Sequence, residues 1–369
     1  MSKRKYSCDL PFHHLATRPD GRIFPCCNFS YTESPEDLNV THPDPFNHPF
    51  LVDIRRKMLN DEYISGCNRC YSEEKITGDS MRLRTNRDNN AGFPQTGRGT
   101  LPLLTNIDLA FSNVCNNKCR MCGPALSTSW YKDAQDFPES FGAKIPRRGI
   151  ETKNTILNQT DLTNLRFIKI LGGEPLMEEE KIIELLEKCD RSKLKILINT
   201  NTTLRPSSRL LNLLKELEKV FFILSVDAYG PLNDFLRKGS EWNQVDSNIK
   251  WFQKNFSDTK IHSVVSLYNV NKFNEIIEYC KDLNIYHDYT LVDGPIWMMP
   301  RNLPSNTKNK IIKQYSNESY DIYKIIINEL KKDGNIELFK TADTKLNKIR
   351  LENWKNLNPW LYYNIYNVS

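Results

Sequence analysis

The sequence lacks any long apolar run. No stretch of about 18 consecutive apolar residues occurs in the chain, so a membrane-spanning helix of ordinary length is excluded. The charged start, MSKRKYSCDL, has no apolar stretch behind it, and no secretory signal peptide is therefore expected. We expect a cytoplasmic protein without a membrane partner.

A strong excess of one charge is also missing. The formal net charge is +6, and no known nucleic-acid-binding motif accompanies the basic residues. Several arginines could still contact phosphates, namely Arg82, Arg84, Arg87, Arg147 and Arg148. The sequence leaves a nucleic-acid partner possible but unsupported.

Cysteine is abundant, with ten residues in 369. In a protein that is not exported, reducing conditions keep thiols free, so metal or redox use is favoured over disulfides. Eight of the ten cysteines precede residue 123. The other two, Cys189 and Cys280, lie singly in helix-like apolar patterns, which predicts buried structural thiols.

From about residue 105 the chain alternates short β-branched runs with longer amphipathic stretches, which predicts βα units around a parallel sheet. The six expected strands are residues 105–111, 166–172, 194–200, 220–226, 260–267 and 288–292. Six such units predict a partial (β/α)6 barrel of the α/β class. Functional residues in such folds gather at the carboxyl ends of the strands.

Composition divides the chain into four parts. Residues 1–86 are rich in Pro, His and Cys and are expected to form a small α+β domain that a metal helps to hold together. Residues 87–104 read as a polar linker, and residues 105–303 as the barrel. Residues 304–369 are expected to form a helical extension, with one long amphipathic helix and an aromatic tail that docks on the barrel.

Three cysteines follow the first barrel strand in the spacing C-x3-C-x2-C: Cys115, Cys119 and Cys122. Three close thiolates can hold three irons of a four-iron cluster, whereas ferredoxin clusters use four cysteines. The fourth iron would keep an open position, as catalytic metal sites do. This predicts that a substrate or cofactor binds there. A zinc site completed by a ligand from elsewhere is the alternative.

Polar residues and glycines stand at the carboxyl ends of the next three strands. The second strand ends in the sequence GGEP, where glycines let the backbone approach a ligand and the carboxylate can accept hydrogen bonds from an ammonium group. The third strand ends near Asn199. The fourth ends in Ser225 and Asp227, which alternation places on one face, suited to ribose hydroxyls. Together these motifs can surround one ligand beside the cysteine loop.

These motifs resemble those of the radical S-adenosylmethionine (SAM) superfamily over roughly residues 105 to 300. The resemblance implies that the three loop cysteines ligate a [4Fe–4S] cluster and that SAM chelates the fourth iron through its amino and carboxylate groups. The SAM-binding residues implied by the resemblance are Met121, Gly172, Gly173, Glu174, Pro175, Asn199, Ser225, Asp227 and Arg237.

The resemblance also implies roles for these residues. The GGEP segment would bind the amino end of SAM, and Ser225 and Asp227 the ribose. Met121 takes a place often held by an aromatic residue and would supply an apolar wall near the adenine. Arg237 resembles an arginine that contacts the SAM carboxylate in relatives with auxiliary clusters, and a surface salt bridge is its alternative.

A second group of cysteines lies before the barrel. Cys8 and Cys26 flank Gly21 in the spacing C-x12-G-x4-C, and Cys67 and Cys70 follow as C-x2-C. The arrangement resembles SPASM and twitch domains, which in most relatives follow the barrel. The resemblance implies one auxiliary [4Fe–4S] cluster held by these four cysteines. Residues 20–27 predict a hairpin strand in which Gly21 forms the turn and returns Cys26 toward Cys8.

Two alternatives remain open for this group. Strand alternation points Cys27 away from Cys26 and predicts a buried thiol, although Cys27 could replace Cys8 as a ligand. A structural zinc site with four cysteine ligands could take the place of the cluster.

The resemblance thus implies a radical SAM enzyme, of oxidoreductase or transferase type, that cleaves SAM to a 5′-deoxyadenosyl radical and abstracts a substrate hydrogen. The auxiliary cluster would transfer electrons or bind substrate, and a flavodoxin or ferredoxin would serve as reductant. Family resemblance favours a peptide or protein substrate over a nucleotide, nucleic acid, sugar or other small molecule. A two-cluster electron carrier without catalysis is the rival from another class.

Overall fold

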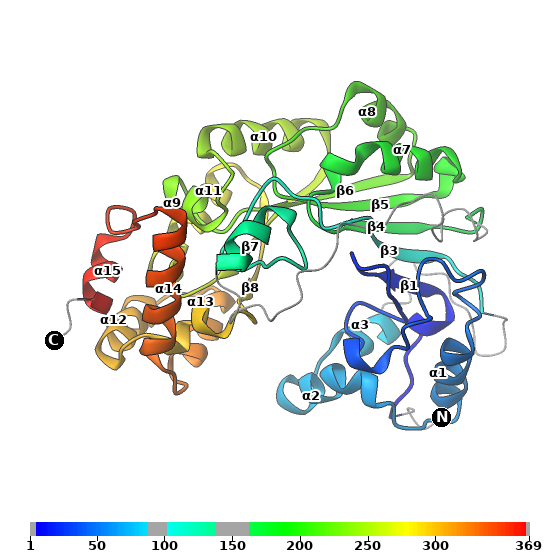
Figure 1. The fold of residues 1–369 in the computed structure, drawn as a ribbon, viewed down its shortest axis with the longest axis horizontal. Coiled ribbons are helices and arrows are strands. Elements are labelled where there is room, and N and C mark those ends of the chain that lie inside the picture. Colours follow the sequence, from blue (N-terminus) through cyan, green and yellow to red (C-terminus); the bar gives the residue numbers. More distant parts are fainter. Residues whose placement is uncertain (1–4, 88–101, 137–161, 367–369) are drawn as a thin grey trace. The chain divides into compact units, whose positions relative to one another are not determined.

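The computed structural model describes residues 5–87, 102–136 and 162–366 (Figure 1). Its sheet has the strand order β2-β1-β3-β4-β5-β6-β7-β8. The strands are β1 (His14–Thr17), β2 (Ile23–Phe24), β3 (Asn106–Ala110), β4 (Phe167–Leu171), β5 (Lys195–Thr200), β6 (Lys219–Ser225), β7 (Asp258–Val265) and β8 (Tyr286–Leu291). The last six coincide with the six expected strands and follow one another in chain order, which confirms the α/β fold class with a partial barrel.

Two short N-terminal strands extend the sheet. The sequence predicted the hairpin strand over residues 20–27 but not that this hairpin joins the sheet of the barrel. β1 runs parallel to β3, with Leu15 opposite Ile107, and β2 pairs antiparallel with β1. The turn between β1 and β2 holds Gly21 at a φ of 87°, and the Gly21 N–H donates to the Arg18 carbonyl at 2.9 Å. A left-handed backbone favours glycine, so the expected hairpin turn is confirmed.

The chain divides into two compact units. The first takes its described residues from Met1–Val114, Arg147–Asn199 and Pro206–Phe221, and the second from Cys115–Pro146, Thr200–Arg205 and Phe222–Ser369. The N-terminal cysteine group lies in the first unit and the C-x3-C-x2-C loop in the second. The domain boundaries expected after residues 86, 104 and 303 stay a prediction, and most of the expected linker lies outside the described residues.

Helices of the first unit are α1 (Pro49–Leu59), α2 (Asn68–Thr77), α3 (Met81–Arg87), α7 (Glu179–Glu187) and α8 (Ser208–Lys215). In α1 the buried residues Leu51, Ile54 and Met58 recur at intervals of three and four, as one apolar helix face requires. The His48 ring accepts a hydrogen bond from the Phe50 N–H at 3.2 Å and so caps this helix. Ile54 and Met58 of α1 share one buried core with Ala16 of β1 and Phe24 of β2, and α1 lies in the same N-terminal part of the chain as α2 and α3 (Figure 1).

Helices of the second unit are α4 (Tyr131–Asp136), α9 (Pro231–Leu236), α10 (Trp242–Asn255), α11 (Phe273–Asp282), α12 (Ser305–Tyr315), α13 (Asp321–Leu330), α14 (Ile336–Arg350) and α15 (Pro359–Tyr366). The single long helix expected after residue 304 is wrong, because four helices occupy this stretch. Gly334 brings the chain against the Arg301 carbonyl between α13 and α14, where a Cβ would lie 2.0 Å from that oxygen. α14 then ends at Leu351, which adopts a φ of 54°.

The aromatic tail docks on the barrel, as expected. The side-chain amide of Asn358 donates to the carbonyl of Tyr268, a residue that follows β7, at 3.1 Å. The Trp354 ring lies 5.3 Å from the Tyr268 ring in an edge arrangement. These contacts tie the last helix to the end of a barrel strand.

Two further expectations can be compared with the structure. Cys189 and Cys280 are only 9% and 2% exposed, which confirms that these thiols are buried. Among the described residues, no helix is both long and apolar enough to cross a membrane.

His287 on β8 should make the protein less stable as the pH falls from 6.5 toward 5. Burial lowers the pKa of its imidazole from 6.5 to about 4. In this interval the unfolded chain binds a proton that the folded chain does not, so stability is full above pH 6.5 and falls by up to about 1.4 kcal/mol per pH unit below it.

The measurement is the free energy of unfolding at pH 7 and pH 5 for the wild type and for His287→Phe, which keeps the ring that stacks on Phe273. We expect a smaller loss in the variant. Equal losses in both proteins would exclude His287 as a source of the pH dependence.

Candidate functional site

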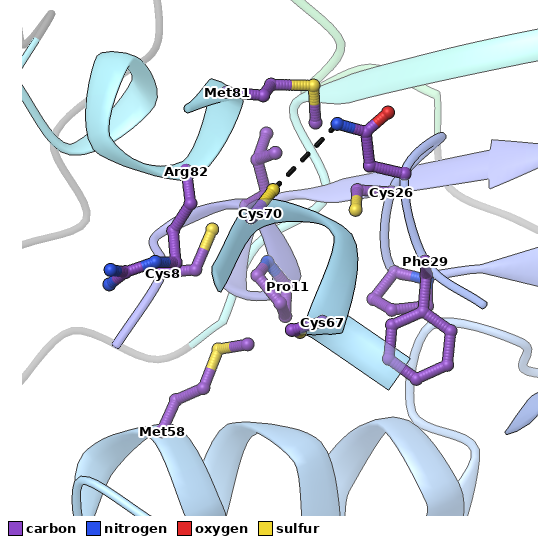
Figure 2. A pocket seen from close by; sticks show the side chains of 12 residues that line it. Cys8, Pro11, Cys26, Phe29, Met58, Cys67, Cys70, Met81 and Arg82 are labelled. Carbon is purple, nitrogen blue, oxygen red and sulfur yellow. Dashed lines mark hydrogen bonds between the residues drawn. The ribbon is translucent and has the colours of Figure 1, made fainter. Parts of the chain in front are cut away.

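The N-terminal cysteines line one pocket of the first unit (Figure 2). They are Cys8, Cys26, Cys67 and Cys70. The space they surround is about 370 Å³, part of it open to solvent, and Phe29, Met58 and Met81 contribute apolar wall. The structure thus brings together all four cysteines that the sequence assigned to the auxiliary site.

Local structure explains this convergence. The β1–β2 hairpin brings Cys26, which follows β2, back into the pocket that Cys8 also lines. Cys67 directly precedes α2 and Cys70 stands three residues later, so both lie on one side of the first helical turn. The amino end of a helix favours negative charge, which suits thiolates.

Burial controls the protonation of these thiols. It raises the pKa of Cys8 and of Cys26 well above the usual value and that of Cys67 to about 12, and neighbouring cysteines add to each shift. These thiols therefore stay protonated at neutral pH unless a metal replaces their protons. Polar donors also face the group: the Asn28 side-chain amide donates to Cys70 Sγ at 3.8 Å, and the backbone N–H groups of Leu10 and Asn28 face the thiols of Cys8 and Cys26.

This donor set fits an iron–sulfur cluster. Four cysteine sulfurs, an apolar wall and an N–H group directed at a sulfur are the features that hold and tune such clusters. Four thiols also satisfy the ligand requirement of structural zinc. Among the described residues, no three or more His, Cys, Asp or Glu side chains are arranged to hold a single metal ion as they stand.

Cys27 lies outside the residues that line this pocket. Its thiol donates to Met81 Sδ at 3.7 Å. Burial and the nearby Asp108 carboxylate raise its pKa, while Lys169 and Arg18 act in the opposite direction. Cys27 is therefore not among the cysteines that line the pocket, and its thiol is half-buried where the sequence predicted a buried one.

The C-x3-C-x2-C loop begins five residues after β3, in the second unit. Cys115 and Cys119 are 8% and 5% exposed, whereas Cys122 and its neighbour Met121 are half-buried. Two of the three thiols are thus shielded from bulk water, and the third is more accessible.

Four consecutive residues, Ser127 to Trp130, fasten the backbone of this loop. The Ser127 hydroxyl donates to the Asn117 carbonyl at 2.6 Å, and the Ser129 hydroxyl to the Cys115 carbonyl at 2.7 Å. The Thr128 hydroxyl accepts from the Cys115 N–H at 3.4 Å, and the Trp130 indole donates to the Cys119 carbonyl at 2.9 Å. This segment fixes where the cysteines stand.

Three N–H groups face the loop sulfurs. The Asn117 backbone donates to Cys115 Sγ at 3.4 Å, and the Asn201 side chain to the same sulfur at 3.8 Å. The Arg237 guanidinium donates to Cys119 Sγ at 3.9 Å. Hydrogen bonds to ligand sulfurs are among the factors that set the potential of an iron–sulfur cluster.

The thiols of Cys119 and Cys122 titrate as a pair. A hydrogen bond between them lowers the pKa of Cys119, with a further contribution from the positive charge of Arg237. The same hydrogen bond, together with burial, raises the pKa of Cys122. Cys119 is therefore the member of the pair that ionises more readily.

The GGEP segment is fastened to the strand end that leads into the loop. Gly173 donates to the Ser112 carbonyl at 3.0 Å and Glu174 to the Val114 carbonyl at 2.8 Å. A Cβ on Gly173 would lie 2.1 Å from the Val114 oxygen, so this approach requires glycine. Glu174 is fully buried, and its Oε1 accepts from the Leu176 N–H at 3.0 Å, so this oxygen caps the turn that begins at Pro175.

Asp227 and Arg237 form a buried ion pair. Asp227 Oδ2 lies 2.7 Å from Arg237 Nε, and Asp227 Oδ1 accepts from the Val264 N–H at 2.9 Å. Although burial alone would lower it, the pKa of Arg237 is raised by Asp227 and by Cys119. The sequence assigned these residues to the ribose and to the SAM carboxylate but did not predict that they pair with each other. Ser225, at the end of β6, is half-buried.

Two buried amides leave polar atoms for a bound group. Both side-chain polar atoms of Asn117 are buried without a hydrogen-bond partner in the described structure, as is Oδ1 of Asn199. Such atoms are rare in folded proteins and call for a partner that the protein itself does not supply. Within the second unit, the Asn117 atoms together with three thiols and three N–H donors to sulfur fit a loop that holds an iron–sulfur cluster and a polar cofactor.

Sequence reasoning missed several residues that support the loop. Asn117 lies inside the cysteine loop and Asn201 at the end of the third expected strand, but neither was assigned a role, and the segment from Ser127 to Trp130 belongs to no motif. The position of Asn201 directly after β5 was the one available signal, because polar residues at strand ends mark sites in parallel sheets.

Asp227→Asn should destabilise the second unit strongly, because it leaves the charge of Arg237 buried without its partner. The expected loss is about 3 kcal/mol. The measurement is the free energy of unfolding by denaturant. Asp246→Asn is the matched control, since Asp246 pairs with the exposed Lys250 and should cost less than about 1 kcal/mol. Equal losses of unfolding free energy in the two variants would show that the buried Asp227–Arg237 pair contributes no more to stability than an exposed pair.

Residues 109–280 match the family model described as the Radical SAM superfamily. Among solved structures, the chain is similar to anSMEcpe with bound AdoMet and Cp18Cys peptide, with 20% identity, a TM-score of 0.40, and coverage of 57% of this chain and 58% of that one. It is similar to Streptococcus suis SuiB with 16% identity, a TM-score of 0.39, and coverage of 87% and 70%.

The anSMEcpe match therefore spans less than two thirds of that protein's length. A search of curated proteins finds no match. The matched segment, 109–280, contains the cysteine loop, the GGEP segment and the ends of β5 and β6. This segment, just under half of the chain, is therefore similar to the radical SAM superfamily.

Proposed function

We propose that Cys115, Cys119 and Cys122 hold a [4Fe–4S] cluster with one iron open to SAM, and that the enzyme abstracts a hydrogen atom from its substrate. When bound, the cluster and SAM supply reductive cleavage of a carbon–sulfur bond to give a 5′-deoxyadenosyl radical. The observation that carries the proposal is the set of N–H donors to Cys115 and Cys119 within the segment that matches the superfamily.

The loop's neighbours would orient the ligands. Asn117, Asn201 and Arg237 donate to two of the sulfurs and thereby stabilise the negative charge that thiolate ligands carry. The segment from Ser127 to Trp130 keeps the loop backbone from shifting when cofactor binds. Burial of Cys115 and Cys119 excludes water from two ligands.

The cofactor-binding residues follow from the strand ends. We propose that the backbone from Gly172 to Pro175 receives the amino end of SAM, that Asn199 and Ser225 face its polar groups, and that Met121 covers the adenine. Because both carboxylate oxygens of Asp227 already contact protein, we assign Asp227 to positioning Arg237, which in turn faces the cluster loop and the SAM carboxylate.

The second metal site would be the pocket of the first unit. We propose that Cys8, Cys26, Cys67 and Cys70 hold an auxiliary [4Fe–4S] cluster that passes electrons to or from the substrate, or binds it. The support is the convergence of four cysteines on one pocket, together with the raised pKa values of Cys8, Cys26 and Cys67, which keep these three thiols protonated until a metal replaces their protons.

The substrate class rests on the resemblance of these N-terminal cysteines to SPASM and twitch domains. On that ground we propose a peptide or protein substrate, and a flavodoxin or ferredoxin as the electron donor. A nucleotide, nucleic acid or sugar substrate is the alternative that a substrate screen would have to exclude.

The test is an anaerobic assay of the reconstituted full chain with dithionite and SAM. We expect 5′-deoxyadenosine to form in proportion to enzyme, with little or none in the absence of dithionite. A chain with intact clusters that forms no 5′-deoxyadenosine would refute the proposed reaction.

A further inference from the structure

Arg120, between Cys119 and Met121, is buried in the second unit with no exposed surface. Its guanidinium donates to the Tyr268 hydroxyl at 3.0 Å and stacks 3.8 Å from the centre of the Phe235 ring. Its other terminal nitrogen donates to Asn347 and Glu352. A charged group is buried this completely only where paired partners replace water. Here two of those partners come from the C-terminal region.

The acceptors of Arg120 are themselves held in place. Tyr268 donates through its hydroxyl to Asp343 on α14. The Trp354 indole donates to the other oxygen of Asp343 at 2.9 Å, and the Tyr366 hydroxyl donates to that oxygen as well. The Asp343 carboxylate thus accepts hydrogen bonds from Tyr268, Trp354 and Tyr366. Its Oδ1 also lies 3.5 Å from Nη1 of Arg120.

A second set of contacts centres on Asp133 of α4. Asp133 on α4 pairs with Lys118 at 2.8 Å and with Arg350, the last residue of α14, at 2.6 Å. The Arg350 guanidinium lies over the Trp130 ring at 4.3 Å, and Trp130 donates to the Cys119 carbonyl. Through Arg350, α14 therefore contacts Asp133, which binds the Lys118 side chain, and Trp130, which binds the Cys119 carbonyl.

Glu352 joins these contacts to the backbone of the loop. Its Oε1 pairs with Lys238 at 2.8 Å while its Oε2 accepts from Arg120. The carbonyls of Leu236 and Lys238 accept from the backbone N–H groups of Arg120 and Lys118, each at 2.8 Å. The Glu352 carboxylate, just past the end of α14, thus contacts the loop in two ways. It binds the Arg120 side chain directly, and it binds Lys238, whose backbone carbonyl accepts from the loop.

We propose that α14 and the residues that follow it form a clamp that positions the cysteine loop, with Arg120, Asp343 and Glu352 as its positioning residues. The inference rests on the proposed function, because it gives the C-terminal region a task at the same site. The clamp holds the loop in the geometry that the cluster requires, and losing it should loosen the loop before it unfolds the unit.

The test uses hydrogen exchange, followed by mass spectrometry, on the full chain without cluster. Glu352→Gln removes the charge that Arg120 and Lys238 share. Glu329→Gln is the matched control, because Glu329 is a buried acid of the same unit, 3% exposed, that pairs with Arg301 and Lys332 instead. We expect about tenfold faster exchange in the peptide that carries Lys118 and Arg120 in Glu352→Gln alone, with β7 unchanged.

A second readout is retention of iron on the loop. With cluster loaded, Glu352→Gln and Arg120→Lys should lose the SAM-sensitive cluster about tenfold faster to a chelator than wild type or Glu329→Gln. Arg120→Lys keeps the positive charge but loses the planar guanidinium that binds several acceptors at once. This variant therefore still tests the clamp if Glu352→Gln fails to fold.

The outcomes separate the clamp from the proposed reaction. Equal exchange and equal iron loss in Glu352→Gln and Glu329→Gln would overturn the clamp, even if the wild type cleaves SAM. A wild type without a SAM-sensitive cluster would instead overturn the proposed function, while faster loop exchange in Glu352→Gln alone would still support the clamp.

Discussion

Cys119→Ala should lose SAM cleavage while the rest of the protein, including its second cluster, stays intact. The substitution removes one of only three protein ligands of the proposed loop cluster, and the Cys119 thiol is also the one that ionises more readily and faces Arg237. We expect iron to fall from about eight to about four atoms per chain. 5′-Deoxyadenosine should fall to the background of the assay.

The control for this variant is Cys189→Ala. Cys189 is as buried as the loop thiols, at 9% exposed, and no role in either site is assigned to it. It should cost some stability through the cavity it leaves but keep all iron and full cleavage of SAM. Unchanged cleavage in Cys119→Ala would remove the basis for placing the catalytic cluster at this loop.

The double substitution Cys67→Ser and Cys70→Ser should separate the two sites in the opposite sense. Serine keeps the size of each side chain but is a poor ligand for iron, so the pocket of the first unit should lose its cluster. We expect about four irons per chain, nearly unchanged formation of 5′-deoxyadenosine, and loss of substrate turnover. Iron content, the cleavage assay and product analysis report these three quantities.

Cys27→Ser is the matched control for the double variant. Cys27 is next to Cys26 in the chain but outside the residues that line the pocket, and its thiol contacts Met81. It should retain about eight irons. The proposed ligand set would be wrong if Cys27→Ser lost a cluster while the double variant kept both clusters. Cys27 would then be a ligand, and Cys67 and Cys70 would not be.

The barrel could be predicted from the sequence because its signals are local. Each strand from β3 to β8 is a short β-branched run between amphipathic stretches, and parallel strands bring their ends together whatever the loops do. The Gly21 turn was equally local, since its left-handed backbone admits few other residues. The pairing of β1 with β3 could not be predicted, because a four-residue strand carries too little alternation to show which sheet it joins.

The supports of the cysteine loop could not be predicted, because they depend on contacts between distant residues. Arg120 and Glu352 are 232 positions apart, and Asp133 and Arg350 are 217 apart. No periodic pattern in the sequence around these residues indicates that they form such pairs. The pairing of Asp227 with Arg237 spans only ten residues, but neither residue stands in a pattern that marks the two as partners.

The central claim is that the chain carries two iron–sulfur clusters, one of which binds SAM. Anaerobic iron and sulfide quantification, with EPR spectra recorded before and after addition of SAM, tests it most directly. The account predicts about eight irons and one cluster signal that SAM perturbs, while the other stays unchanged. About four irons with zinc in the N-terminal pocket, or two cluster signals that both ignore SAM, would contradict it.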